Sequence, residues 1–201
     1  MPGETFEKAR EIFSRHNGIL RASQANKLGL HGMVLTRMVD EGLLVKEGRG
    51  IYRLADLPPL SNPDFVRVSL SIPTSVICLI SALNFHNLTT QIPYKVYIAL
   101  PRSAKKPQID YPPLDIIWPK EEIYLAGIEE HRMDGVPVKV YSKEKTIADC
   151  FRYNKKVGLS VAIEALKDYL GEQNKDLGML FTYARIDHVE EIITPYVKAI
   201  V

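Results

Sequence analysis

Basic and polar side chains between residues 21 and 53 are of the types that contact nucleic acid. Arg37 can pair with a guanine edge or with a phosphate, and Thr36 can hydrogen-bond to either group. Lys46 and Arg49 lie on or beside a Gly-Arg-Gly turn, from which long cationic side chains can reach a phosphate backbone. The predicted DNA-binding residues are Arg21, Gln24, Lys27, His31, Thr36, Arg37, Lys46 and Arg49.

Positive charge is in local excess in this part of the chain. From Arg21 to Arg53 there are six basic residues against three acidic ones, whereas residues 58–201 carry 17 of each sign. The net charge of the whole chain is only +2, so no global excess indicates nucleic acid. One small basic module binds weakly at cellular salt, so we expect cooperative binding or a second basic surface. A solvated surface or a protein-docking module is an alternative interpretation of three excess charges.

The elements that must position these side chains follow from apolar spacing. Residues 4–16 are predicted to form an amphipathic helix, and two shorter helices are predicted over 21–28 and 31–41. A hairpin is predicted over 44–55, because Gly48 and Gly50 permit a tight reversal between two short apolar runs. Three helices followed by a two-stranded ribbon are typical of a winged helix-turn-helix, whose last helix enters the major groove.

A proline-rich segment, residues 58–63, is predicted to link two domains. Residues 1–57 would form the winged helix-turn-helix domain and residues 64–201 a larger mixed α+β domain, so the predicted fold class is α+β. In the second part, helices are predicted over 74–86, 142–154 and 160–170, and strands over 94–100, 114–118 and 123–126, with a hairpin leg over 133–140. The last 30 residues are predicted to be helical, with breaks at Gly178 and Pro195.

The sequence offers little support for an enzyme. No glycine-rich phosphate loop is present, no histidine pair has metal-ligand spacing, and no nucleophile lies beside a base, so we expect no catalytic residues, no metal and no cofactor. Cys78 and Cys150 lie in apolar surroundings and are interpreted as buried thiols of a cytoplasmic protein. No secretion signal and no apolar run of membrane-spanning length is found, so no membrane partner is expected.

A second group of cations follows Ser142. Lys145 and Asp149 are four residues apart on a predicted helix and can form an ion pair. In the alternative interpretation, five cations form a second basic patch for DNA, RNA or an acidic protein surface. These five are Lys143, Lys145, Arg152, Lys155 and Lys156.

Three longer stretches resemble the AbiEi antitoxins, the antitoxin half of AbiE-type, type IV, toxin–antitoxin systems of bacteria. They are EGLLVKEGRGIYRL, then SALNFHNLTTQIPYKVYIALPR, then HRMDGVPVKVYSKEKTIADCFRYNKKVGLSVAIEALKDYL. The resemblance covers roughly residues 5–170. Its most specific parts are Asn-Leu-Thr-Thr-Gln-Ile-Pro, Gly-Val-Pro-Val and Lys-Thr-Ile-Ala-Asp-Cys-Phe-Arg.

This resemblance implies an N-terminal winged helix that binds inverted repeats in the operon's own promoter and represses it. It also implies a C-terminal domain that neutralises a nucleotidyltransferase-like toxin and assists cooperative DNA binding. Antitoxins of this family are described as opposing the toxin without a stable complex. We expect a monomer that binds double-stranded DNA cooperatively, since nothing in the sequence resembles a coiled-coil dimerisation segment.

Two other functions compete with this one. The chain would act as a protein-interaction module if it neutralised the toxin by direct stoichiometric binding, and the two proteins would then co-purify. An enzyme acting on the toxin or on its substrate would turn over that material when purified.

Overall fold

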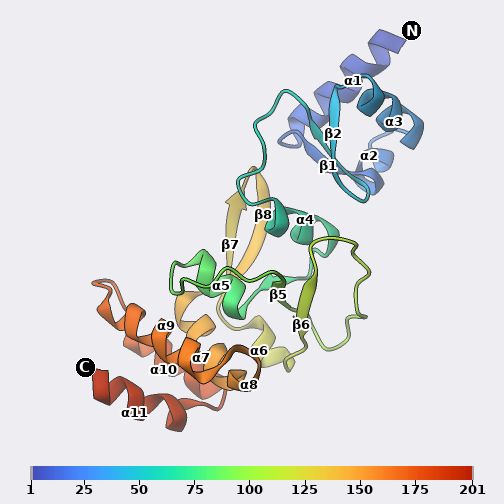
Figure 1. Ribbon diagram of the computed structural model, residues 1–201. Coiled ribbons are helices and arrows are strands. Elements are labelled where there is room, and N and C mark those ends of the chain that lie inside the picture. The colour runs from blue at the N-terminus through green and yellow to red at the C-terminus, as the bar shows by residue number, and fades with distance from the viewer. Residues whose placement is uncertain (1, 201) are drawn as a thin grey trace. The chain divides into compact units, whose positions relative to one another are not determined.

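A computed structural model describes residues 2–200 and shows an α+β protein, which confirms the predicted fold class (Figure 1). Contacts between residues divide the chain into two compact units. The first holds the chain up to Pro73, together with Pro107–Pro112 and Arg132–Val138. The second holds Thr74–Lys106, Pro113–His131 and the chain from Lys139 onward.

The first unit begins with three helices and a small antiparallel sheet, in the order that the sequence predicts. The helices are α1 (Pro2–Arg15), α2 (Ala22–Lys27) and α3 (Gly32–Asp40). The hairpin strands are β2 (Leu44–Gly48) and β3 (Ile51–Leu54), and a short strand not predicted from the sequence, β1 (Ile19–Arg21), pairs with β3. The sheet order is therefore β1-β3-β2.

Apolar residues at helical spacing form the core under these elements. Phe13 of α1, Leu35 and Met38 of α3, and Leu44 and Leu54 of the hairpin are almost completely buried and pack together. Burying large apolar side chains of this kind stabilises a fold by about 1.5–3 kcal/mol each. The opposite faces of α2 and α3 are therefore left to solvent.

Helix α4 (Pro63–Ser71) follows the proline-rich segment and was not predicted from the sequence. Pro63 occupies the first turn, where the missing N–H has no intrahelical partner, and the Asn62 side chain accepts a hydrogen bond from the Phe65 N–H at 3.2 Å. Helix α4 packs against β2 and belongs to the first compact unit. The division into domains at residues 58–63 stays a prediction.

A five-stranded mixed sheet has the order β6-β5-β4-β8-β7. Its strands are β4 (Val76–Ile77), β5 (Val96–Ala99), β6 (Leu114–Ile117), β7 (Ile128–Met133) and β8 (Val136–Tyr141). Strands β4, β5 and β6 belong to the second unit, whereas Arg132–Val138, around the turn between β7 and β8, belong to the first. Strand β4 pairs antiparallel with β5 and parallel with β8, and β5 pairs parallel with β6. Parallel neighbours require long connections, which the intervening helices and loops supply.

Helices cover this sheet and form most of the second unit. They are α5 (Leu79–Phe85), α6 (Glu121–Leu125), α7 (Lys143–Arg152), α8 (Asn154–Val157), α9 (Leu159–Gly171), α10 (Leu177–Ile186) and α11 (Glu190–Ile200). Helix α7 packs against α5, α9 and α10, and Figure 1 shows α7, α9, α10 and α11 gathered together. None of the helices within residues 2–200 is both long and apolar enough to cross a membrane.

Three predictions of secondary structure were wrong. Residues 123–126 are not a strand but lie mostly in α6, because a short apolar run fits a strand and a helix equally well. Residues 74–86 contain β4 before α5 rather than one helix. Gly178 and Pro195 lie inside α10 and α11, and the real break falls between these helices, where His188 adopts a φ of 56°.

Candidate nucleic-acid interface

One face of helix α3 is exposed to solvent. Leu35 and Met38 fix its orientation by being buried, so Thr36 and Arg37 lie on the exposed side. Met33, on the same side, is 78% exposed. The Thr36 hydroxyl donates to the Gly32 carbonyl at 3.1 Å and can still accept a hydrogen bond.

The start of α3 and the side chain of Arg37 are held by local contacts. His31 is the N-cap residue of α3 with extended backbone, and its side chain is exposed. The Arg37 guanidinium lies 5.7 Å from the centre of the Phe6 ring on α1, which orients this long side chain without removing it from solvent. The guanidinium therefore remains able to donate to an external acceptor.

Helix α2 places two more of the predicted residues on the surface. Gln24 and Lys27 are exposed, and the Gln24 side chain accepts a hydrogen bond from the Arg21 backbone N–H at 3.1 Å. Arg21 itself is half-buried, and its Nη1 donates to the Ser71 carbonyl at 3.4 Å. Arg21 is therefore partly committed to a contact inside the first unit.

The wing, defined as strands β2 and β3 with their turn, carries Lys46 and Arg49 outward. Both side chains are exposed, and that of Arg49 is 83% exposed and lies 4.0 Å from the Asp110 carboxylate. A pair this exposed contributes little to stability, so Arg49 is available to another anion. The Gly50 carbonyl accepts from the Ala22 N–H at 2.8 Å, which ties the wing turn to the start of α2.

Buried ion pairs fix the base of the wing. Arg53 of β3 is buried, its Nε donates to Glu47 of β2 at 2.6 Å, and its Nη1 donates to the carbonyls of Leu54 and Leu57. Asp56, which follows β3 closely in the sequence, pairs with Arg10 of α1 and not with Arg53. Arg67 of α4 donates to the other oxygen of Glu47 at 3.3 Å.

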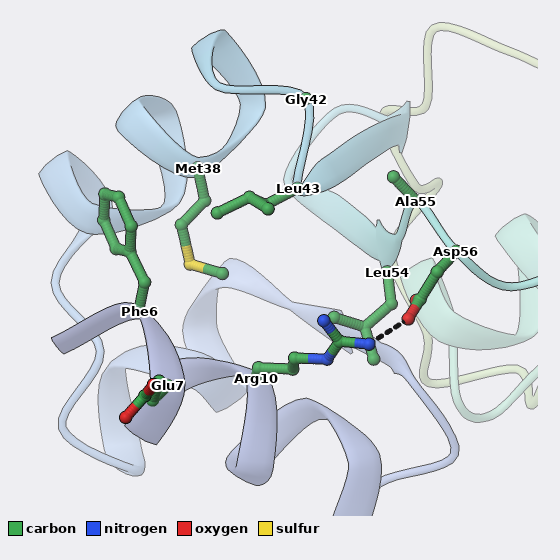
Figure 2. A pocket seen from close by; sticks show the side chains of 9 residues that line it. All are labelled: Phe6, Glu7, Arg10, Met38, Gly42, Leu43, Leu54, Ala55 and Asp56. Carbon is green, nitrogen blue, oxygen red and sulfur yellow. Dashed lines mark hydrogen bonds and ion pairs between the residues drawn. The ribbon is translucent and has the colours of Figure 1, made fainter. Parts of the chain in front are cut away.

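A pocket of about 220 Å³ lies where α1 meets the end of α3 and the end of β3 (Figure 2). Figure 2 shows the side chains of Phe6, Met38, Leu43 and Leu54 around it, with the Arg10–Asp56 ion pair at one side. Its lining is mainly apolar. An apolar hollow of this kind does not suit a phosphate backbone, so it is not part of the candidate interface.

The predicted second basic patch is not a free cationic surface. The Lys145 side chain is completely buried, so its inclusion was wrong, and its pairing with Asp149 at 2.6 Å confirms the simpler interpretation. Lys143 pairs with Glu172 at 2.7 Å, and Lys156 pairs with Asp115. Arg152 donates to the Asp187 carbonyl at 2.6 Å, whereas Lys155 is exposed.

Lys145 instead lies at the centre of a buried charge cluster in the second unit. Its Nζ donates to Asp149 and, at 3.1–3.2 Å, to both oxygens of Asp187, and it lies 4.7 Å from the centre of the Tyr141 ring. Burial alone would lower the pKa of Lys145, but the two carboxylates outweigh it and raise that pKa. Two acids around one ammonium leave one charge uncompensated unless a proton is retained.

We assign that proton to Asp187. Burial, followed by the charge of Asp149, raises the pKa of Asp187 to about 8 despite the opposing effect of Lys145. The native state therefore keeps a proton that the unfolded chain releases near its ordinary pKa of 3.8. Because the native state binds more protons in this window, the stability of the second unit falls as pH rises from about 4 to about 8.

We predict that Asp187→Asn removes this pH dependence. Asparagine has the shape of the protonated acid and cannot ionise. The free energy of unfolding of the variant should therefore increase relative to that of wild type between pH 5 and pH 8, by at most about 1.4 kcal/mol per pH unit. Urea unfolding followed by Trp118 fluorescence measures this difference. Burial lowers the pKa of His86 in both proteins, so its opposite contribution cancels. Parallel stability profiles would contradict the assignment of the proton to Asp187.

Other candidate chemistry is not assembled in the described part of the chain. Among residues 2–200, no group of three or more His, Cys, Asp or Glu side chains is placed to hold a metal ion. Cys78 and Cys150 are free and buried, and burial is the main cause that raises the pKa of both thiols. Both are therefore poor nucleophiles.

One comparison with known protein families matches the part of the chain that contains the candidate interface. A family model described as "Transcriptional regulator, AbiEi antitoxin" matches residues 7–55, which contain α2, α3 and the wing. This match confirms the resemblance seen in the sequence for the segment that it covers. A search of curated proteins finds no significant match.

Proposed function

Since residues 7–55 match the AbiEi antitoxin transcriptional regulators, we propose that this protein is an antitoxin that represses its own operon. In this proposal α3 enters the major groove of inverted repeats in the promoter, and the wing contacts the adjacent backbone. The second unit neutralises a nucleotidyltransferase-like toxin. The protein acts in the cytoplasm, without enzymatic activity, as a monomer that binds DNA cooperatively.

One observation carries the DNA-binding part of the proposal. Seven of the eight predicted contact residues have exposed side chains on α2, α3 and the wing, and they are Gln24, Lys27, His31, Thr36, Arg37, Lys46 and Arg49. The apolar faces of the same elements form the core, so these polar faces are left to solvent. Arginine, lysine, threonine and glutamine are the side chains that hydrogen-bond to base edges and phosphates.

Footprinting on the DNA upstream of the gene tests this function. We expect the full chain to protect two inverted repeats, with an affinity that falls steeply between 50 and 200 mM salt because phosphate contacts release counterions. A random duplex of equal length should bind more weakly. Equal binding to both duplexes would remove the promoter-specific part of the proposal.

Direct stoichiometric binding to the toxin is the second candidate function. Two large apolar side chains in the loop between α5 and β5 favour it, since Ile92 is 90% exposed and Tyr94 is 81% exposed. Exposed apolar side chains near each other are typical of protein–protein contacts. Co-elution of the two proteins in gel filtration would support this function, and separate elution at micromolar concentration would argue against it.

A further inference from the structure

We propose that a cleft beside the wing binds a phosphate of the DNA backbone, and that Arg67 of α4 is a contact residue there. This inference rests on the proposed DNA-binding function and deepens it. It adds to the interface a helix that lies outside residues 7–55 and that the sequence did not predict.

The cleft has a volume of about 580 Å³ and belongs to the first unit. Its lining includes three arginines, Arg21 before α2, Arg49 at the wing turn and Arg67 on α4. Two carboxylates, Glu47 and Asp110, also line it. Arginines from three separate elements therefore line one cleft, whose volume is large enough to admit a phosphate group.

Arg67 is held against the wing with part of its donor capacity unused. Arg67 Cδ lies 3.9 Å from the point that a Cβ atom on Gly48 would occupy. The aliphatic part of the Arg67 side chain therefore lies beside the wing turn. The guanidinium donates through Nη2 to Glu47 at 3.3 Å, its Nη1 lies 3.5 Å from the Asp64 carboxylate, and it lies 5.6 Å from the centre of the Tyr111 ring. Its buried Nε has no hydrogen-bond partner among the described residues. The remaining N–H groups of Nη1 and Nη2 can donate to a phosphate oxygen, and a guanidinium fixed in this way is already positioned to do so.

The two carboxylates in the cleft play different parts. Both oxygens of Glu47 are occupied, one by Arg53 and one by Arg67, so this charge is already compensated. Asp110 is exposed and lies 4.0 Å from Arg49, where it is weakly held. Asp110 therefore occupies the position of an anion next to Arg49, and a DNA phosphate that enters the cleft must compete with it.

Fluorescence anisotropy of the full chain with two DNA duplexes tests the cleft. One duplex spans the region upstream of the gene, and the other has a random sequence of the same length. Because a phosphate contact is independent of sequence, Arg67→Gln should weaken binding to both duplexes by a similar factor, about 3–10-fold, and should lower the salt slope by about one. Asp110→Asn should strengthen binding to both by about 2–5-fold, since it removes the competing charge.

The controls separate this inference from the proposed function. Arg15→Gln removes an exposed arginine of α1 outside the cleft and should leave both affinities unchanged. Arg67 also holds Glu47, so its variant is compared with wild type by thermal unfolding, while Asp110→Asn tests the cleft at an exposed position without that role. If Arg67→Gln and Asp110→Asn bind like wild type while an Arg37→Ala variant loses affinity, the cleft is refuted and the proposed function stands. If the wild-type chain binds neither duplex, both are refuted.

Discussion

Replacing Lys145 by methionine is expected to lower the free energy of unfolding of the second unit by about 3–5 kcal/mol. The substitution keeps most of the side-chain volume and removes only the ammonium that compensates Asp149 and donates to Asp187 in a completely buried site. Losing one partner of a buried ion pair leaves the other charge unsolvated, and this costs far more than losing a surface pair. Urea unfolding followed by the fluorescence of Trp118, the single tryptophan, measures the change.

Two further variants identify the cause of the loss. Lys143→Met removes a neighbouring ammonium of the same helix, and its pair with Glu172 is partly exposed, so we expect a loss of about 1 kcal/mol or less. Asp149→Asn in the Lys145→Met background removes the uncompensated charge and should recover part of the lost stability. A Lys145→Met protein as stable as wild type would show that the cluster does not hold the second unit together.

The double substitution Arg37→Ala and Arg49→Ala is expected to weaken binding to the upstream DNA by about 100-fold or more. Each arginine at such a position contributes about 1–3 kcal/mol through base or phosphate contacts, and the two lie on separate exposed elements, α3 and the wing turn. Affinity measured at two salt concentrations separates the two roles. The loss of a phosphate contact lowers the salt slope, whereas the loss of a base contact lowers mainly the preference for the promoter.

Folding controls are needed because Arg37 also stacks on Phe6 of α1. We expect the double variant to unfold within a few degrees of the wild-type temperature, since both side chains are exposed. Replacement of Arg15, an exposed arginine on α1, serves as the matched control and should not affect DNA binding. Unchanged affinity of the double variant would refute the proposed reading surface.

Local patterns were sufficient to predict the winged part of the first unit. The apolar spacing of α1 and α3 and the glycines of the wing are patterns that extend over only a few neighbouring residues. The helices and the hairpin could therefore be predicted from the sequence alone. Strand β1 was missed because three residues carry too little pattern, and it exists only through pairing with β3. Helix α4 was missed because three nearby prolines indicate a linker, although one of them begins the helix.

The positions of charged residues were harder to predict, because they depend on contacts distant in sequence. The four-residue spacing of Lys145 and Asp149 on a helix predicts their ion pair. Asp187, the third member of the cluster, is 42 residues from Lys145, and no local pattern connects the two. Nothing local distinguishes the buried Lys145 from the exposed Lys155. Similarly, Arg67 contacts Glu47 of the wing, which is 20 residues away in the sequence, and no pattern in either segment predicts this contact.

The central claim, that the exposed face of α3 enters the DNA groove, is tested most directly by site-specific cross-linking. A photo-crosslinking amino acid in place of Met33, which is 78% exposed on that face, is compared with the same amino acid in place of the exposed Glu11 on α1. The account predicts a strong cross-link to the upstream duplex from position 33 and little or none from position 11. Bound DNA that cross-links from position 11 but not from position 33 would contradict it.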